Sequence, residues 1–406
     1  MIKRELYLKK LRESYESDLI KVIIGVRRCG KSVLLIQIIE ELTKKGIKDN
    51  HIIYMNFENY DYIDYTDPKK FNEYVKSKII DQEKHYLFFD EIQNVNDFER
   101  VINSFRATLN VSIFITGSNS KLLSSELATH LAGRYISIKM TPFTFSEFIE
   151  LHNKNADDKN KKSIKELFEV YLIWGGMPQI YNTDSVLERK LYLKDLYNTI
   201  VLKDIVERNN IKDMNLLDRI TQSMMENIGS IVSSNSIANY LKGEKINTTV
   251  DTVLNYVDYI SGSLIFNKVN RYDIRGKKVM STLEKYYMID LGFLQLKKSQ
   301  IEKREGGRLE NIIYNELISR GYDVYIGKTE KGEIDFIVNN FGEISYFQVS
   351  DYLSSDAVIE REFGAFKTVP DNYPKYVITM DEIDYSQNGI IHINIIKFLL
   401  DKDYLK

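Results

Sequence analysis

The segment GVRRCGKS, residues 25–32, constrains this chain more than any other feature, because it matches the phosphate-binding pattern G-x-x-x-x-G-K-[ST]. The apolar run IKVIIG precedes it and the amphipathic run SVLLIQIIEELTKK follows it, as expected for a strand and a helix. Glycines let backbone N–H groups surround a polyphosphate, and a helix that begins near Lys31 directs its positive dipole end at that charge. The pattern therefore predicts a nucleoside triphosphate site.

Side-chain chemistry predicts the roles within this loop. Lys31 neutralises the β- and γ-phosphates, and the Ser32 hydroxyl ligates Mg²⁺. Two arginines are unusual in such a loop, and either Arg27 or Arg28 could reach phosphate instead. The predicted nucleotide-binding residues are Gly25, Val26, Arg27, Arg28, Cys29, Gly30, Lys31, Ser32, Val33 and, from the next motif, Asp90.

The segment YLFFDE, residues 86–91, has four apolar residues followed by two carboxylates. This pattern is typical of a buried parallel strand that ends at the carboxyl edge of a sheet. Asp90 is predicted to hold the Mg²⁺ hydration shell, and Glu91 to act as the general base for the attacking water. Adjacent acids after a strand are also ordinary solvated turn residues, but the phosphate loop favours hydrolysis.

The first part of the chain alternates strand and helix patterns, as in a doubly wound parallel sheet. The further strand candidates are HIIYMNF, VSIFITGS and RYISIKM, and helices are predicted over NDFERVINSFRATL and SKLLSSELATHLAG. The end of one strand, ITGSNS, places Thr116, Ser118 and Asn119 at the same sheet edge, where they could sense or position the attacking water. The alternative is that Ser118 or Asn119 caps the next helix.

Composition indicates a multidomain globular protein. A chain of 406 residues is long enough for two or three cores, and 43% hydrophobic and 28% charged residues is a globular balance. The only cysteine, Cys29, cannot form an internal disulfide, and no apolar run suits a membrane or a signal peptide, so a cytoplasmic protein is expected. Because the net charge is −2, contact with nucleic acid requires a local basic patch.

The two nucleotide motifs, the T-G-S strand end and LAGRYISIKMTPFTFSEF together resemble the prokaryotic AAA+ type ATPases that have a conserved carboxy-terminal domain of formerly unknown function. The resemblance covers nearly the whole chain and implies ATP as the nucleotide. It implies an α/β P-loop ATPase core (1–150), a winged-helix domain (216–298) and a module similar to the PD-(D/E)xK nuclease fold (305–406). The helical pattern between the first two predicts a linker or lid region (164–215). Arg134 matches a conserved arginine of such ATPases, which could be an arginine finger or a sensor, and in trans it implies a homo-oligomer. The alternative for Arg134 is a surface or salt-bridged residue at the start of a strand.

Residues 234–263 show two helices with a turn at Gly243, in helix-turn-helix spacing, and the second helix has an apolar face formed by Val250, Val253, Leu254, Val257 and Ile260. Two extended runs follow around residues 275–277, as in the wing of a winged helix. The predicted DNA-binding residues of this wing are Arg271, Arg275, Lys277 and Lys278. The second helix exposes Thr249, Thr252, Asn255 and Tyr256 but no arginine, so base-specific contacts should be weak. A protein partner is the alternative to DNA.

In the nuclease fold that the terminal segment resembles, carboxylates hold a divalent metal and an acid-x-Lys pair completes the site. Glu310 and Asp335 stand at the first two positions, but Gln348 and Ser350 replace the acid and the lysine. Cleavage should therefore be slow or absent, unless Glu362 or Lys367 substitutes for the missing groups. The alternative is a degenerate module retained for binding or assembly.

Three functional hypotheses share the ATPase. The favoured one is a DNA-associated ATPase motor or switch that uses ATP and Mg²⁺. The others are an ATP-controlled metal-dependent nuclease and a signalling-type nucleotide switch that binds protein partners.

Overall fold

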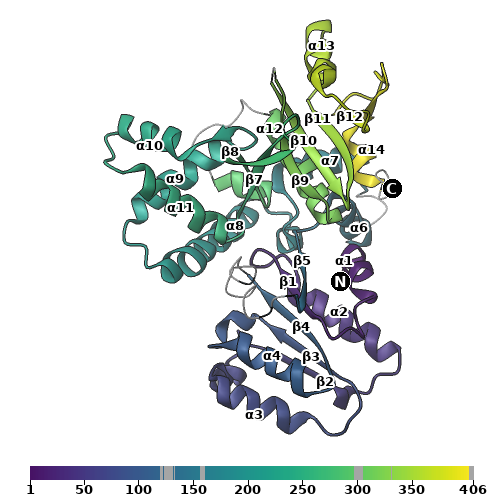
Figure 1. Ribbon diagram of the computed structural model, residues 1–406, viewed down its shortest axis with the longest axis vertical. Coiled ribbons are helices and arrows are strands. Elements are labelled where there is room, and N and C mark those ends of the chain that lie inside the picture. The colour runs from purple at the N-terminus through teal and green to yellow at the C-terminus, as the bar shows by residue number, and fades with distance from the viewer. Residues whose placement is uncertain are drawn as a thin grey trace. The chain divides into compact units, whose positions relative to one another are not determined.

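The computed structural model describes residues 1–118, 122, 131, 133–155, 161–296, 305–330 and 332–401. The chain divides into two compact units, Met1–Met140 and Thr141–Lys406 (Figure 1). The expected end of the ATPase core at residue 150 lies beyond this division, within helix α6 (Phe145–Asn155) of the second unit. The helix expected over 120–133 lies outside the described residues, except for residues 122, 131 and 133.

The first unit is built on a five-stranded parallel sheet with the strand order β2-β3-β4-β1-β5. Its strands are β1 (Ile20–Ile24), β2 (Ile52–Asn56), β3 (His85–Asp90), β4 (Val111–Gly117) and β5 (Tyr135–Lys139). The described residues of this unit form the α-helices α1 (Glu5–Arg12), α2 (Lys31–Lys44), α3 (Pro68–Lys78) and α4 (Phe98–Thr108), and the short 3₁₀ turns η1 (Asp49–His51), η2 (Tyr60–Thr66) and η3 (Ile92–Asn94). This sheet confirms the predicted α/β fold with a parallel sheet.

Burial follows the sequence pattern of the strands. Every residue of β1, β3 and β4 is buried, as expected for central parallel strands that helices cover on both faces. The edge strands β2 and β5 are only partly buried. Because β1 pairs with β4 and β4 with β3, the carboxyl ends of all three strands meet at one edge of the sheet.

The second unit combines helices with a larger sheet. These are α6, α7 (Ile164–Trp174), α8 (Val186–Thr199), which continues as the π-helix η7 (Ile200–Glu207), α9 (Met214–Glu226), α10 (Ser234–Gly243) and α11 (Val250–Gly262), with the 3₁₀ turn η6 (Pro178–Asn182). Later come η8 (Leu291–Leu296), α12 (Glu305–Arg320), α13 (Asp356–Gly364), η9 (Ala365–Thr368) and α14 (Ile395–Leu400). On α11 the buried apolar residues are Val253, Val257 and Ile260. Val250 and Leu254 are exposed, so the expected apolar face is narrower than the sequence pattern indicated.

The sheet of the second unit has eight strands in the order β13-β12-β11-β10-β9-β7-β8-β6. Their bounds are β6 (Ile231–Val232), β7 (Phe266–Asp273), β8 (Lys278–Met288), β9 (Asp323–Lys328), β10 (Glu333–Asn340), β11 (Glu343–Val349), β12 (Lys375–Thr379) and β13 (Ile390–Asn394). The hairpin β7–β8 joins the carboxy-terminal strands because β7 pairs in parallel with β9. The regions predicted as separate wing and terminal modules thus share one sheet.

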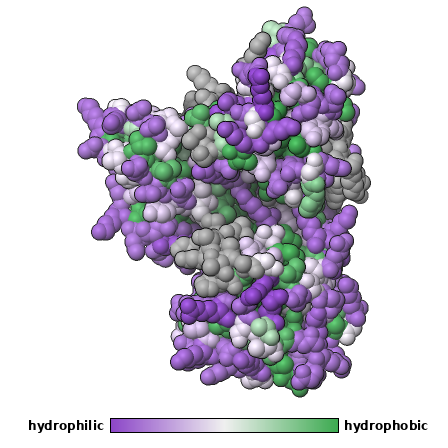
Figure 2. All heavy atoms as spheres, viewed as in Figure 1, coloured by the Kyte–Doolittle hydropathy of each residue, from purple (hydrophilic) through white to green (hydrophobic). Residues whose placement is uncertain are grey.

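Among the described residues, no helix has the length and apolar character needed to cross a membrane. Hydrophilic side chains cover most of the surface that Figure 2 shows on each unit.

Candidate functional site

The predicted phosphate loop joins β1 to α2 in the first unit. Gly30 is the N-cap of α2 and has φ +106°. This left-handed conformation would be strained for a residue with a side chain. A Cβ on Gly25 would lie 2.5 Å from the Met140 oxygen, so the backbone passes too closely for any other residue. Val26 and Cys29 are fully buried, and burial raises the pKa of the Cys29 thiol. The loop thus has the glycine-dependent backbone that a phosphate cradle requires.

Lys31 and Glu91 form a buried ion pair at this sheet edge. The Lys31 Nζ lies 3.1 Å from the Glu91 Oε1 and also donates to the Gly25 and Val26 oxygens at 3.1 and 3.4 Å. Burial alone lowers the pKa of Lys31, but the Glu91 charge raises it above its ordinary value. Burial likewise acts to raise the pKa of Glu91, but Lys31 holds it below its usual range. Both groups are therefore charged at neutral pH.

Asp90, the last residue of β3, lies beside Ser32 and Thr116. The Thr116 hydroxyl donates to the Asp90 Oδ1 at 2.5 Å, and the Ser32 hydroxyl is also hydrogen-bonded to this carboxylate. Burial raises the pKa of Asp90, while these two hydroxyls oppose the shift. Ser32 and Asp90, predicted as a magnesium pair from distant motifs, are thus brought together, and their oxygens are the ligand type that Mg²⁺ prefers. Val33 lies with Ser32 in the first turn of α2.

Gln93 is a site residue that the sequence patterns did not indicate. Its Nε2 donates to the Glu91 Oε2 at 2.5 Å and to the Ser118 Oγ at 3.4 Å. Thr116 accepts from the Glu91 backbone N–H at 2.9 Å, and Glu91 has φ +52°, which is uncommon for a residue with a side chain. Two hydrogen-bonding neighbours and an unusual backbone therefore hold Glu91. Asn119 lies outside the described residues.

Arginines outside and inside the loop have different partners. Arg4, which precedes α1 and was not predicted, donates from its Nη1 to the Cys29 oxygen at 2.9 Å and so contacts the backbone of the loop. Arg27 forms an ion pair with Glu58 at 2.5 Å, and Arg28 is exposed with φ +68°.

Arg134 lies at the amino end of β5, where its oxygen accepts from the Ile20 N–H at the amino end of β1. Its guanidinium is hydrogen-bonded to the Asn103 Oδ1 at 3.1 Å. The phosphate loop follows the carboxyl end of β1, one strand length or about 16 Å away. Arg134 therefore does not contact the loop of its own chain, which excludes the finger or sensor role in cis.

The predicted nuclease-type acids of the second unit meet around Lys285 of β8. The Lys285 Nζ lies 2.6 Å from Glu333, 3.3 Å from Glu310 and 3.6 Å from Asp335. Burial, together with the charge of Asp335, raises the pKa of Glu310, and burial raises the pKa of Asp335. Burial acts to lower the pKa of Lys285, but these carboxylates raise it. The sequence patterns missed Lys285 because it belongs to the hairpin and not to the terminal segment.

Two other predicted members of that site lie differently. The Gln348 Oε1 accepts from the Asp335 backbone N–H at 3.4 Å, so this oxygen is engaged by the neighbouring strand. Lys367 is exposed and forms an ion pair with Glu360. Glu362 is buried, and its charge acts on Asp335, so it borders the acid cluster.

The hairpin β7–β8 displays only part of its predicted basic set. Arg271 is buried at 9% exposure, so its expected phosphate contact is wrong. Lys277 and Lys278 are exposed at the turn, and Arg275 is exposed and ion-paired with Glu330.

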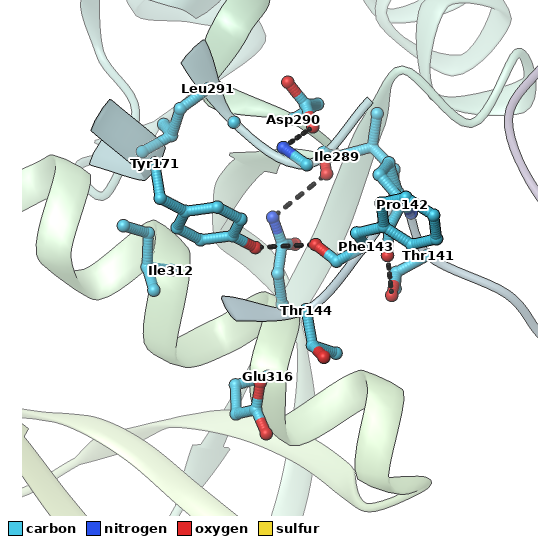
Figure 3. Close-up of a pocket in the computed structure, with 13 residues that line it drawn as sticks. Thr141, Pro142, Phe143, Thr144, Tyr171, Ile289, Asp290, Leu291, Ile312 and Glu316 are labelled. Atoms are coloured by element: carbon cyan, nitrogen blue, oxygen red, sulfur yellow. Dashed lines mark hydrogen bonds between the residues drawn. The ribbon is translucent and has the colours of Figure 1, made fainter. Parts of the chain in front are cut away.

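Asp290 lines a small pocket in the second unit (Figure 3). The Asp290 carboxylate accepts from the Gly176 N–H at 2.6 Å and from the Gly292 N–H at 2.8 Å, and burial raises its pKa to about 7. A Cβ on Gly176 would lie 2.0 Å from the Phe143 oxygen, which explains why glycine interrupts the helical pattern here. Tyr171 donates to the same oxygen at 2.8 Å. The pocket lies between the loop before α6, helix α7, the segment that follows β8, and α12.

Comparisons with known proteins match the first unit to an AAA domain. A family model described as AAA domain matches residues 17–149, and a domain of unknown function (DUF8612) matches residues 165–302. An "Uncharacterized protein" of Haemophilus influenzae is 38% identical over 405 residues, which are 98% of this chain and 99% of the relative. "Uncharacterized protein MJ1544" of Methanocaldococcus jannaschii is 30% identical over 384 residues, 93% of this chain and 84% of the relative. The solved structure of Cdc6p from Pyrobaculum aerophilum is 12% identical, covering 77% of this chain and 93% of that chain, with a TM-score of 0.31.

The parallel sheet, the glycine-dependent loop and the match to an AAA domain define a P-loop protein of the AAA+ class. More particularly, the chain belongs to the family of AAA-domain proteins that includes the Haemophilus and Methanocaldococcus relatives.

Proposed function

We propose that this protein binds ATP with Mg²⁺ and hydrolyses it. The observation that supports the proposal best is the meeting of Lys31, Ser32, Asp90 and Glu91 at one edge of the sheet. Ser32 and Asp90 would hold the Mg²⁺, which shields phosphate charge when bound. The main-chain amides of residues 25–30 and the ammonium of Lys31 bind the phosphates.

Glu91 acts as the general base. In the empty site Lys31 lowers the pKa of Glu91, so the carboxylate is ionised. When Lys31 leaves for phosphate this lowering is relieved, and the carboxylate becomes a better acceptor for a proton from water. Gln93 and Thr116 orient it, and Ser118 orients Gln93. When ATP binds, the Lys31 ammonium leaves Glu91 and contacts phosphate, so the Glu91 carboxylate becomes available to act on water.

The first test is nucleotide binding by Lys31→Ala. Loss of the ammonium leaves the phosphate charge uncompensated, and ATP binding measured by calorimetry should fall below detection. Unchanged affinity would contradict the assignment of the loop.

We further propose that the ATPase acts on or with DNA as a motor or switch. Helices α10 and α11 followed by the hairpin β7–β8 fit a winged helix, and Lys277 and Lys278 are exposed at its turn. The measurement is the ATPase rate with duplex, forked and single-stranded DNA beside the Glu91→Gln control. A rate that no DNA changes would favour a protein partner instead.

The terminal module is proposed to bind or assemble rather than cut. Lys285 already supplies a positive charge to Glu310, Glu333 and Asp335, which takes the place of the countercharge a metal would bring. Labelled DNA should stay intact with Mg²⁺ or Mn²⁺, and metal-dependent cutting that Asp335→Asn abolishes would establish the nuclease.

Arg134 is proposed to act in trans, in a homo-oligomer, because it lies away from the phosphate loop of its own chain. The ATPase rate per chain should then rise with protein concentration. A rate independent of concentration would disfavour this role.

A further inference from the structure

Two histidines and an aspartate meet in the first unit, at the edge of the sheet opposite the phosphate loop. His51 directly precedes β2 and His85 is the first residue of β3, while Asp81 lies in the loop between α3 and β3. One potential ligand atom from each lies within 4.8 Å of the other two. We propose that His51, Asp81 and His85 bind a transition-metal dication such as Zn²⁺, at a site separate from that of the nucleotide magnesium.

The hydrogen bond of His85 prepares it as a ligand. Its Nδ1 lies 2.9 Å from the Glu83 oxygen, a carbonyl that can only accept, so Nδ1 bears the proton. The Nε2 therefore carries the lone pair, which accepts a hydrogen bond from the Ile80 N–H at 3.4 Å, and a metal ion would take the place of this donor. A backbone carbonyl that holds the distal nitrogen is the usual support of a metal-bound histidine.

His51 and Asp81 supply the other donors. The His51 Nε2 lies 2.9 Å from the Asp81 Oδ2 and 3.5 Å from the Glu83 Oε2. The Glu83 N–H donates to the other oxygen of Asp81 at 2.9 Å, which fixes the turn. The two imidazole rings pack edge to face at 4.7 Å, so they are already held against each other. Glu83 or water completes a four-coordinate site.

The donor set selects the class of metal. Two imidazole nitrogens and a carboxylate suit Zn²⁺, whereas Mg²⁺ prefers oxygen ligands and keeps its waters. Zinc bonds of about 2.0–2.1 Å place tetrahedral ligand atoms about 3.3 Å apart, closer than the outer limit of 4.8 Å here. Asp81 is 41% exposed and can move inward, while both histidines are buried and fixed.

The position separates this site from the ATPase chemistry. His85 begins β3 and Asp90 ends it, five residues or about 17 Å further along the strand. A metal bound here ties the loop before β3 to the amino ends of two strands. The site is therefore expected to be independent of nucleotide.

The experiment uses the full chain after treatment with a chelator. Co²⁺ is added without nucleotide while visible absorption is recorded, and Zn²⁺ binding is measured by calorimetry. We expect one Co²⁺ per chain with a visible spectrum, displacement by Zn²⁺, and no displacement by millimolar Mg²⁺. Lys31→Ala, which removes nucleotide binding, should keep the full signal, so failure of the ATPase proposal would not affect this result.

Asp81→Asn is the deciding variant, because the side chain is exposed and asparagine keeps the hydrogen bond to the Glu83 N–H. Asp81→Asn and His85→Asn should each weaken Co²⁺ binding at least tenfold, while His152→Asn, which lies in the second unit, should leave it unchanged. Wild-type affinity in Asp81→Asn, or no visible spectrum in the wild type, would overturn the proposal.

Discussion

Replacing Glu91 by glutamine should weaken the empty protein and strengthen its binding of ATP. In the structure the two charges of the Lys31–Glu91 pair lie 3.1 Å apart, with side chains only 3% and 8% exposed. The substitution removes the negative charge but keeps an oxygen that accepts a hydrogen bond from Lys31. The perturbation therefore isolates the electrostatic part of the pair.

The magnitude follows from this geometry. At an effective dielectric constant of about 20, two charges 3.1 Å apart attract by about 5 kcal/mol. Removing one partner of a buried pair costs about 3–5 kcal/mol, and the retained hydrogen bond favours the lower end of that range. Without nucleotide, the free energy of unfolding of Glu91→Gln should thus fall by about 3 kcal/mol.

ATP should stabilise Glu91→Gln more than it stabilises the wild type. Lys31 must leave Glu91 to reach phosphate, and the Glu91 carboxylate also repels the phosphate charge. Removing the carboxylate charge therefore favours ATP binding for both reasons. We expect an affinity at least tenfold higher, which corresponds to about 1.4 kcal/mol. Hydrolysis should slow by about 10²–10⁴-fold, because the general base is lost.

Scanning calorimetry with and without ATP and Mg²⁺ measures the stability, and titration calorimetry measures the affinity. The matched control is Glu58→Gln, which removes the half-exposed partner of Arg27 at the same loop and should change stability by less than about 1 kcal/mol. Equal ATP affinity in Glu91→Gln and the wild type would refute the idea that Glu91 and phosphate compete for Lys31.

Three further predictions concern the second unit. Reversing the charges of Lys277 and Lys278 to glutamate should weaken DNA binding and reduce the slope of log K against log salt by about 2, measured by fluorescence anisotropy; an unchanged slope would favour a protein partner. Lys285→Met should lower the free energy of unfolding by about 3–5 kcal/mol, because it leaves buried carboxylates unpaired, and unchanged denaturant midpoints would show that the lysine is not their countercharge. Stability should also depend on Asp290, whose folded-state pKa is raised from 3.8 to about 7. The folded protein then keeps a proton that the unfolded chain releases, so stability falls by about 4 kcal/mol as the pH rises from about 4 to about 7; Asp290→Asn should flatten this profile, and an identical slope in both proteins would contradict it.

The sequence predicted the first unit well because its signals are local. Each apolar run became a strand, and the rule that parallel strands share a carboxyl edge already placed Asp90, Glu91 and Thr116 beside one another. The sequence analysis did not predict Gln93 and Arg4 as site residues, because no sequence pattern distinguishes them. Gln93 enters the site through the turn after β3, and Arg4 through the packing of α1 against α2.

The second unit was harder to predict because its main features depend on pairings between distant segments. The parallel contact of Arg271 with Ile326 joins β7 to β9, and nothing in the local pattern of either strand specifies that partner. The same pairing explains the error at Arg271, since a residue assigned to an exposed wing lies inside a continuous sheet. The strand pattern predicted the β7–β8 hairpin but not the strand β9 that pairs with it.

This continuity bears on how the second unit would use a DNA contact. Lys285 belongs to the hairpin, whereas Glu310, Glu333 and Asp335 belong to α12 and β10, so the buried ion pairs cross from one predicted module to the other. Together with the β7–β9 pairing, they make the hairpin a part of the eight-stranded sheet and not a separately hinged wing. A force on Lys277 and Lys278 would then be transmitted to the terminal strands as a movement of one body. An acid cluster closed by its own lysine is well suited to this mechanical role, because it holds the two segments together without needing a metal ion.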